Sequence, residues 1–271
     1  MLNELDKVVM IQIDPVAFAE MCLGFHPDEI QTAILRDEAD RIILCCHRQF
    51  GKTTVTAVIA LHYAAYNPGA LILIIAKAER QAQELLRKVR QMGILMGEIS
   101  FVNESRTHIE LGNRSRVISL PSSSGGIRGY SAPDLVICDE ASRIEEDVYV
   151  ALRPMLLQGG RMIMLSTPAG KRGFFYQKWI EENEWKKYMV TLDNNPRITQ
   201  EAYEKEKRDW NERAFSQEFL CEFLDLEGQV ISTDYIRRAF SSSVKPLFKQ
   251  DGNGKHVPTK IFDKNVKPIM R

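Results

Sequence analysis

Residues 46–53 hold the feature that most restricts the fold of this chain, a Gly-Lys-Thr bend between an apolar run and a helical stretch. The segment Cys46-His47-Arg48-Gln49-Phe50-Gly51-Lys52-Thr53 fits the phosphate-binding loop pattern GxxxxGK followed by Ser or Thr, except that Cys46 replaces the first glycine. A loop between a strand and a helix N-terminus presents successive backbone N–H groups to phosphate oxygens. The bend therefore predicts a phosphate site, and the alternative is a chance GKT at a helix start.

Apolar runs that alternate with helical patterns predict an α/β fold with a mainly parallel central sheet flanked by helices. Buried strands are expected at 41–46, 71–76, 135–138, 162–165 and 186–192, with shorter β-like pieces at 99–102 and 107–111. Helices are expected as two short pieces within 14–36, after Gly51-Lys52-Thr53-Thr54 as far as about Tyr66, and at 79–92, 145–157, 173–183 and 199–221. We expect a mobile loop at 122–126 and a domain boundary after Leu224.

Within the loop, each residue type suits one part of a nucleotide. Gly51 permits close approach of the backbone, Lys52 would neutralise the β- and γ-phosphates, and the Thr53 hydroxyl would hold Mg²⁺. The expected nucleotide-binding set is His47, Arg48, Gln49, Phe50, Gly51, Lys52, Thr53 and Thr54, with Gln31 added from an upstream helix. The Gln31 amide could contact both the donor and the acceptor of an adenine edge, although an exposed helix glutamine explains it equally.

Two acids close the third apolar run, and this places them at the mouth of a buried strand. In parallel sheets ligands bind at the carboxyl ends of the strands, so these acids should face the loop. Asp139 would join the Mg²⁺ shell, and Glu140 would orient and activate the water that attacks the γ-phosphate. Ser166 and Thr167 end the next strand and could sense loss of that phosphate, or simply cap a helix.

Two arginines compete to stabilise the charge that develops on the γ-phosphate. Arg128 stands between glycines in a loop, where it could reach a phosphate in its own subunit or across an interface. Arg48 lies inside the phosphate loop itself. The sequence does not decide between them.

The charge distribution and the cysteines limit which partners, metal sites and cellular compartments we expect for this protein. Thirty-six basic residues balance 36 acidic ones, but residues 233–271 carry nine basic and three acidic residues, which indicates either a solvated tail or a basic arm beside a polyanion. The five cysteines show no zinc-ligand spacing and are expected to be buried thiols. No signal peptide and no apolar run near the roughly 18 residues of a membrane span is visible, so the expected compartment is the cytoplasm.

The order Gln31, RQFGKTT without a leading glycine, IRG, VICDE and LSTP resembles the ATPase domain of large terminase subunits, the DNA-packaging motors of tailed bacteriophages and herpes-type viruses. The resemblance spans roughly residues 14–225 and implies a P-loop NTPase of the ASCE, helicase-like class. It implies roles for Gln31 at adenine, Arg48 as the loop arginine, and Arg128 as an arginine acting in trans. Lys52, Thr53 and Asp139 match the phosphate and Mg²⁺ ligands, Glu140 the catalytic acid, and Ser166-Thr167 the coupling motif.

From this resemblance we expect residues 1–224 to form the ATPase domain and 225–271 a linker or small C-terminal subdomain that leads to a nuclease domain absent here. ATP and Mg²⁺ are the implied ligands. Double-stranded DNA, a portal protein and a small terminase subunit are the implied partners of a homo-oligomeric, pentameric ring on the procapsid in the host cytoplasm, with no role for a membrane. The alternatives are a helicase-like nucleic-acid translocase and a nucleotide-gated assembly module that binds the portal or the small subunit.

Overall fold

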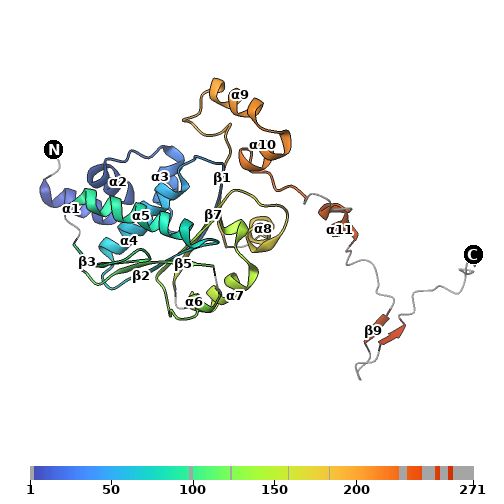
Figure 1. Ribbon diagram of the computed structural model, residues 1–271, viewed down its shortest axis with the longest axis horizontal. Helices are drawn as coiled ribbons and strands as arrows, with labels where there is room; N and C mark the ends of the chain where they lie inside the picture. Colours follow the sequence, from blue (N-terminus) through green and yellow to red (C-terminus); the bar gives the residue numbers. More distant parts are fainter. Residues whose placement is uncertain are drawn as a thin grey trace, which may run out of the picture. The chain divides into compact units, whose positions relative to one another are not determined.

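An eight-stranded, mainly parallel sheet forms the centre of the first part of the chain (Figure 1). The computed structural model describes residues 3–97, 100–122, 124–157, 159–182, 184–225, 231–239, 248–250 and 256–258. It divides into two compact units, Met1–Leu224 and Asp225–Arg271. Across the described ranges, no helix is both long enough and apolar enough to cross a membrane.

The strand order of the sheet is β3-β4-β5-β2-β6-β7-β1-β8. The strands from β5 to β8 in that order pair in parallel, whereas β3, β4 and β5 form antiparallel pairs at one edge. Their bounds are β1 Arg41–Cys46, β2 Leu71–Ala76, β3 Phe101–Glu104, β4 His108–Leu111, β5 Arg116–Pro121, β6 Leu135–Asp139, β7 Arg161–Ser166 and β8 Lys186–Val190. The expected parallel sheet is therefore confirmed, with β7 between β1 and β6.

Helices cover both faces of the sheet (Figure 1). The bounds are α1 Glu4–Ile13, α2 Pro15–Leu23, α3 Glu29–Leu35, α4 Lys52–Tyr66, α5 Glu79–Met96, α6 Ser124–Ile127, the 3-10 helix η1 Ala141–Arg143, α7 Glu146–Met155, α8 Gly173–Ile180, α9 Gln200–Asp209 and α10 Glu212–Glu218. Because side chains alternate along a strand, Ile72 and Ile74 pack with α4 and α5, while Leu73 and Ile75 lie in the opposite layer with α7 and α8.

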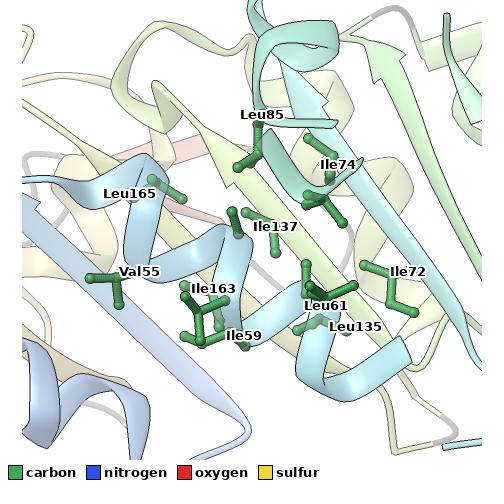
Figure 2. Packing of buried hydrophobic residues seen from close by; sticks show 14 of the residues in the cluster. Val55, Ile59, Leu61, Ile72, Ile74, Leu85, Leu135, Ile137, Ile163 and Leu165 are labelled. Carbon is green, nitrogen blue, oxygen red and sulfur yellow. The ribbon is translucent and has the colours of Figure 1, made fainter. Parts of the chain in front are cut away.

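The layer beneath α4 is a continuous apolar core that fixes the helix following the phosphate loop (Figure 2). Side chains of α4 meet those of β2, β6 and β7, and α5 packs beside them. The core residues labelled in the figure are Val55, Ile59, Leu61, Ile72, Ile74, Leu85, Leu135, Ile137, Ile163 and Leu165. Of the cysteines, Cys45, Cys46, Cys138 and Cys221 are buried and Cys22 is half-buried, all as free thiols.

Several local predictions were wrong. The stretch 199–221 forms two helices, because Asn211 caps a new helix by accepting a hydrogen bond from Ala214 N at 2.8 Å. The short helix α6 begins at Ser124, inside the stretch 122–126 that was expected to be a loop, and runs to Ile127. Helix α5 runs past Gly93, which the sequence placed at its end. An added Cβ at Gly93 would lie 2.5 Å from the Phe101 ring, so close packing explains this glycine, and Gly97 ends the helix in the left-handed region.

Further elements were missed or shifted. The sequence did not predict α1 or name β5, and α7, α8 and β8 are each shorter than expected. In the second unit the described elements are α11 Thr233–Ala239 and the antiparallel pair β9 Phe248–Gln250 and β10 His256–Pro258. Most of the basic segment 233–271 lies outside the described residues.

Candidate functional site

A cavity of about 360 Å³ opens where β1 and β6 end and α4 begins. Its walls bring together the phosphate loop, the two acids after β6 and one face of α5. The lining residues are Arg48, Gln49, Gly51, Lys52, Thr53, Thr54, Gln81, Glu84, Lys88, Asp139 and Glu140. The prediction that the loop and the acids meet at one edge of the sheet is confirmed.

The loop turns through two left-handed residues before α4 begins. Gln49 has a φ of 64° and Gly51 a φ of 93°, and only glycine adopts the latter without strain. The Lys52 ammonium donates hydrogen bonds to Cys46 O at 2.9 Å and His47 O at 3.0 Å, and the side chain is 9% exposed. In this conformation Lys52 bridges the carbonyls of its own loop.

The loop is fastened from outside by the segment that follows β8. Because β8 pairs with β1, His47 N donates to Val190 O at 2.7 Å. Asn195 Nδ2 lies 2.9 Å from His47 Nε2, and both side chains are buried. Burial, with a smaller contribution from the Lys52 charge, lowers the pKa of His47 to about 4. A neutral imidazole therefore supports the loop at neutral pH.

Gln31 and Arg197 hold the same loop at Phe50. Gln31 Nε2 donates to Phe50 O at 3.2 Å, while its Oε1 accepts from Asp28 N at 3.2 Å in a capping box. The Arg197 guanidinium also donates to Phe50 O and pairs with Asp28 at 3.0 Å. Gln31 is 1% exposed, and both ends of its amide are engaged by the protein. The geometry therefore makes Gln31 a support of the loop, and its contact with adenine remains a prediction.

Asp139 and Glu140 differ in environment although they are neighbours. Asp139 is 9% exposed, and burial together with the adjacent Glu140 charge raises its pKa to about 6. Its Oδ1 accepts from the backbone N of Glu140 at 2.9 Å. Glu140 has a φ of 50°, an uncommon conformation for a non-glycine residue at a strand end. This backbone turn separates the two carboxylates at the mouth of the cavity.

A chain of ion pairs connects Glu140 to the phosphate loop. Arg143 donates to Glu140 at 2.6 Å and to Glu218 of α10 at 3.4 Å. Glu218, which is 8% exposed, also pairs with Arg48 Nε at 3.2 Å. Both predicted catalytic groups of this subunit, Glu140 and Arg48, thus share one network of alternating charge.

Ser166 and Thr167 lie between the phosphate loop and the two acids, because β7 separates β1 from β6 in the sheet. Ser166 Oγ is 3.5 Å from Glu140 Oε2 and 2.7 Å from Ser142 Oγ, and Ser142 also donates to Thr167 O at 2.8 Å. Both residues are buried, and they connect β7 to the segment that carries Asp139 and Glu140. The Ser166 hydroxyl therefore lies beside the Glu140 carboxylate, and its predicted role in sensing loss of the γ-phosphate stays a prediction.

The two candidate arginines occupy different places. Arg48 lines the cavity, although Glu218 holds it and Trp210 lies 5.9 Å from its guanidinium carbon. Arg128 is exposed on the turn after α6, outside the cavity lining. Its position leaves it open to another molecule, so action in trans stays a prediction.

The donor set of the cavity suits Mg²⁺. Within the described ranges, no three His, Cys, Asp or Glu side chains converge to hold a metal by themselves. Mg²⁺ commonly uses one or two carboxylates together with substrate phosphates and water. The buried carboxylate of Asp139 and the Thr53 hydroxyl, which line one cavity, match that set.

Sequence reasoning missed several residues that build the site. Lys88 belongs to the cavity wall, Arg143 and Glu218 carry the ion-pair chain, and Asn195 and Arg197 fasten the loop. Of these residues, Arg143 could have been found from the sequence, because it lies three residues after Glu140 at the start of a turn.

Comparison with known proteins gives one consistent set of relatives. The family model described as "Terminase large subunit, T4likevirus-type, N-terminal" matches residues 46–238. The large terminase subunit of Thermus phage G20c is 29% identical over 174 residues, which cover 56% of this chain and 36% of that protein. The large subunit of Escherichia phage T5 is 27% identical over 248 residues, 84% of this chain and 55% of that protein. The chain therefore matches between one third and just over one half of the length of these relatives.

Solved structures agree on the fold. The ATPase domain of the Thermus phage P74-26 large terminase superposes with a TM-score of 0.66 at 22% identity, covering 78% of this chain and 99% of that domain. The large terminase of the thermophilic bacteriophage D6E, in complex with ADP, has a TM-score of 0.57 at 12% identity and covers 80% of this chain and 53% of that one. These likenesses confirm the P-loop NTPase fold.

Proposed function

Since this chain belongs to the family of terminase large subunits, we propose that residues 1–224 form an ATP-hydrolysing motor domain that drives double-stranded DNA into a viral procapsid. Residues 225–271 then form a linker toward a nuclease domain. The single observation that carries the proposal is the cavity in which a phosphate-binding loop faces Asp139 and Glu140. The D6E relative in complex with ADP supports a nucleotide as the occupant.

In this proposal, the phosphates of ATP lie against the backbone N–H groups ahead of α4. Lys52 exchanges its bonds to Cys46 O and His47 O for bonds to phosphate oxygens. Thr53 and Asp139 would hold Mg²⁺, which supplies further neutralisation of the phosphate charge when it is bound.

Glu140 accepts the proton of the water that attacks the γ-phosphate, and an arginine stabilises the charge that develops on the phosphoryl oxygens. Arg48 is available within the same cavity, and Arg128 is available to a neighbouring subunit. A lysine-dead subunit mixed with an Arg128→Ala subunit separates the two: activity recovered in the mixture assigns the role to Arg128, and no recovery assigns it to Arg48.

The motor proposal further places the domain in a homo-oligomeric ring on the portal of the procapsid, in the host cytoplasm, with the small terminase subunit as a second partner. Contact with DNA is expected mainly at phosphates, so binding should be sensitive to salt and independent of sequence.

Replacement of Glu140 by glutamine tests the chemistry directly. Glu140→Gln keeps the shape of the side chain but removes its ability to accept a proton, so turnover should fall by about 10²–10⁴-fold. Affinity for a non-hydrolysable ATP analogue should stay within about twofold, because the phosphate loop is intact. Phosphate release and calorimetric titration measure the two effects.

Glu145→Gln is the matched control, since that exposed carboxylate lies five residues away and, within the described part of the chain, its ion pair is with Lys77 at 3.9 Å. Turnover that survives in Glu140→Gln would overturn the assignment of the base. Turnover of the unmodified chain that ignores both DNA and self-association would favour the nucleotide-gated assembly module, and strand separation of a DNA duplex would favour the helicase-like alternative.

A further inference from the structure

Helix α5 contributes a whole wall to the candidate nucleotide cavity. Gln81, Glu84 and Lys88 recur three and four residues apart, so they lie on one face of the helix, and all three line the cavity. The opposite side of the helix is anchored, since Leu85 and Val89 are fully buried. The position of this wall is therefore fixed by the core.

The ammonium group of Lys88 is held at the start of α4. Lys88 Nζ donates a hydrogen bond of 2.8 Å to Thr54 Oγ1, and the side chain is half-buried. Thr54 follows Thr53 in the first turn of α4 and also lines the cavity. The bond therefore places a second lysine beside the phosphate loop, from a residue 34 positions after Thr54 in the chain.

Lys88 differs from the other two cations of the cavity in its bonding. Lys52 donates to two backbone carbonyls of the loop, and Arg48 is paired with the carboxylate of Glu218. The hydrogen bond of Lys88 goes to a neutral hydroxyl. The nearby acid of the same helix face, Glu84, pairs with Arg87 at 2.5 Å. Among the residues that the structure describes, no carboxylate is bonded to Lys88, so it brings an unpaired positive charge to the cavity.

We propose that Lys88 is a phosphate-binding residue of this site and that it contacts the terminal phosphate of a bound nucleoside triphosphate. The inference rests on the proposed function. The phosphate loop cradles the inner phosphates, and the acids mark the end of the chain of phosphates where water attacks. Lys88 shares the cavity with both and comes from neither, so it adds a second lysine charge to the one that Lys52 brings to the β- and γ-phosphates. Thr54 is the positioning residue that keeps the ammonium there.

The test compares the affinity of Lys88→Met for two nucleotides. A cation on the terminal phosphate contributes to binding of the triphosphate and not of the diphosphate. We expect affinity for a non-hydrolysable ATP analogue to fall roughly tenfold and affinity for ADP to change less than about twofold. Calorimetric titration with each nucleotide in the presence of Mg²⁺ measures both.

Two further variants and one control separate a contact from a merely structural effect. Lys88→Arg keeps the charge and should recover most of the analogue affinity. Thr54→Val keeps the β-branched shape but frees the ammonium, and it should show a smaller loss with the same preference for ADP. Arg80→Met removes an exposed cation of α5 that lies outside the cavity lining, and it should bind both nucleotides as the unmodified chain does.

The outcomes distinguish this inference from the function on which it rests. Unchanged analogue affinity in Lys88→Met, or an equal loss for ADP and the analogue, overturns the terminal-phosphate contact while the motor proposal stands. Absence of nucleotide binding by the unmodified chain overturns the proposed function itself.

Discussion

Two of the three walls of the candidate site, the phosphate loop and the acid wall formed by Asp139 and Glu140, are held in place by different forces. The phosphate loop is held mainly by buried hydrogen bonds of neutral groups, such as Asn195 to His47 and Gln31 to Phe50, and in addition by the ion pairs of the more exposed Arg48 and Arg197. The acid wall is held by charge pairs at the cavity mouth, with Arg143 between Glu140 and Glu218. Buried hydrogen bonds are costly to leave unmade, whereas partly exposed ion pairs exchange partners at little cost.

Because of this difference, we expect the loop wall to serve nucleotide binding and the acid wall to serve turnover. A wall fixed by buried bonds keeps the shape needed to bind phosphates. A wall held by exchangeable ion pairs can move Glu140 when the charge in the cavity changes. Variants of the loop should therefore alter nucleotide binding or stability, and variants of the acid wall should alter turnover at constant affinity.

The largest effect is expected from Lys52→Ala in the loop wall. The change removes the phosphate ligand and also leaves Cys46 O and His47 O without their donor. We expect turnover to fall by about 10³-fold and ATP affinity by roughly 10–100-fold, since the interaction is charge-assisted. Phosphate release and nucleotide titration measure the two losses.

Lys77→Ala is the control for removal of a lysine, because that side chain is exposed and lies outside the cavity lining. If Lys52→Ala lost turnover but bound ATP normally, the loop wall would serve catalysis alone, and the proposed division between the walls would fail.

A second effect concerns stability toward acid, and it should belong to the loop wall. Burial and the charges of Lys52 and Arg197 lower the pKa of His47 from 6.5 to about 4. Between these values His47 binds a proton in the unfolded chain and not in the folded chain, so its contribution to the free energy of unfolding falls as the pH falls from about 6.5 to about 4, whereas the raised pKa of Asp139 acts in the opposite direction below about 6. The loss should be on the order of 2 kcal/mol over that interval. Denaturant unfolding at pH 7 and pH 4.5 measures it.

His47→Asn removes this titration, so the difference in unfolding free energy between the two pH values should shrink relative to the unmodified chain. Asn195→Ala keeps the imidazole but removes its partner, and it should destabilise the protein at both pH values. An unchanged pH dependence in His47→Asn would mean that the imidazole titrates in the folded loop as it does in the unfolded chain.

Much of the site was predictable because its chemistry is local in sequence. Lys52 and Thr53 follow a buried strand, and Asp139 and Glu140 end another, so strand direction alone brings them to one edge of the sheet. The contacts that hold the phosphate loop in place were not predictable. Asn195 lies 148 residues from His47, and the two meet only because β8 pairs with β1.

The same limit explains the errors in the fold. The sequence predicted the strand that became β8 but not its neighbour, and Arg197 and Glu218 became loop partners through that pairing. The break between α9 and α10 was visible in principle, because Asn211 is a favourable N-cap, but the run of charged residues around it is typical of one long helix. Lys88 was expected on an amphipathic helix, and its place at the cavity depends on how α5 packs against α4.

The smallest effect should come from Arg143→Met in the acid wall. This variant tests most directly whether the loop wall and the acid wall have separate roles. The change leaves Glu140 with the Ser166 hydroxyl at 3.5 Å as its remaining side-chain contact among those the structure describes. We expect turnover to fall about tenfold because the carboxylate is less well oriented, with ATP affinity unchanged because the loop is intact.

Arg153→Met, on α7 and outside the cavity lining, is the control. Reduced affinity in Arg143→Met would show that its link through Glu218 to Arg48 supports the phosphate loop, so that the two walls act as one unit. Increased turnover would show instead that Arg143 restrains the base.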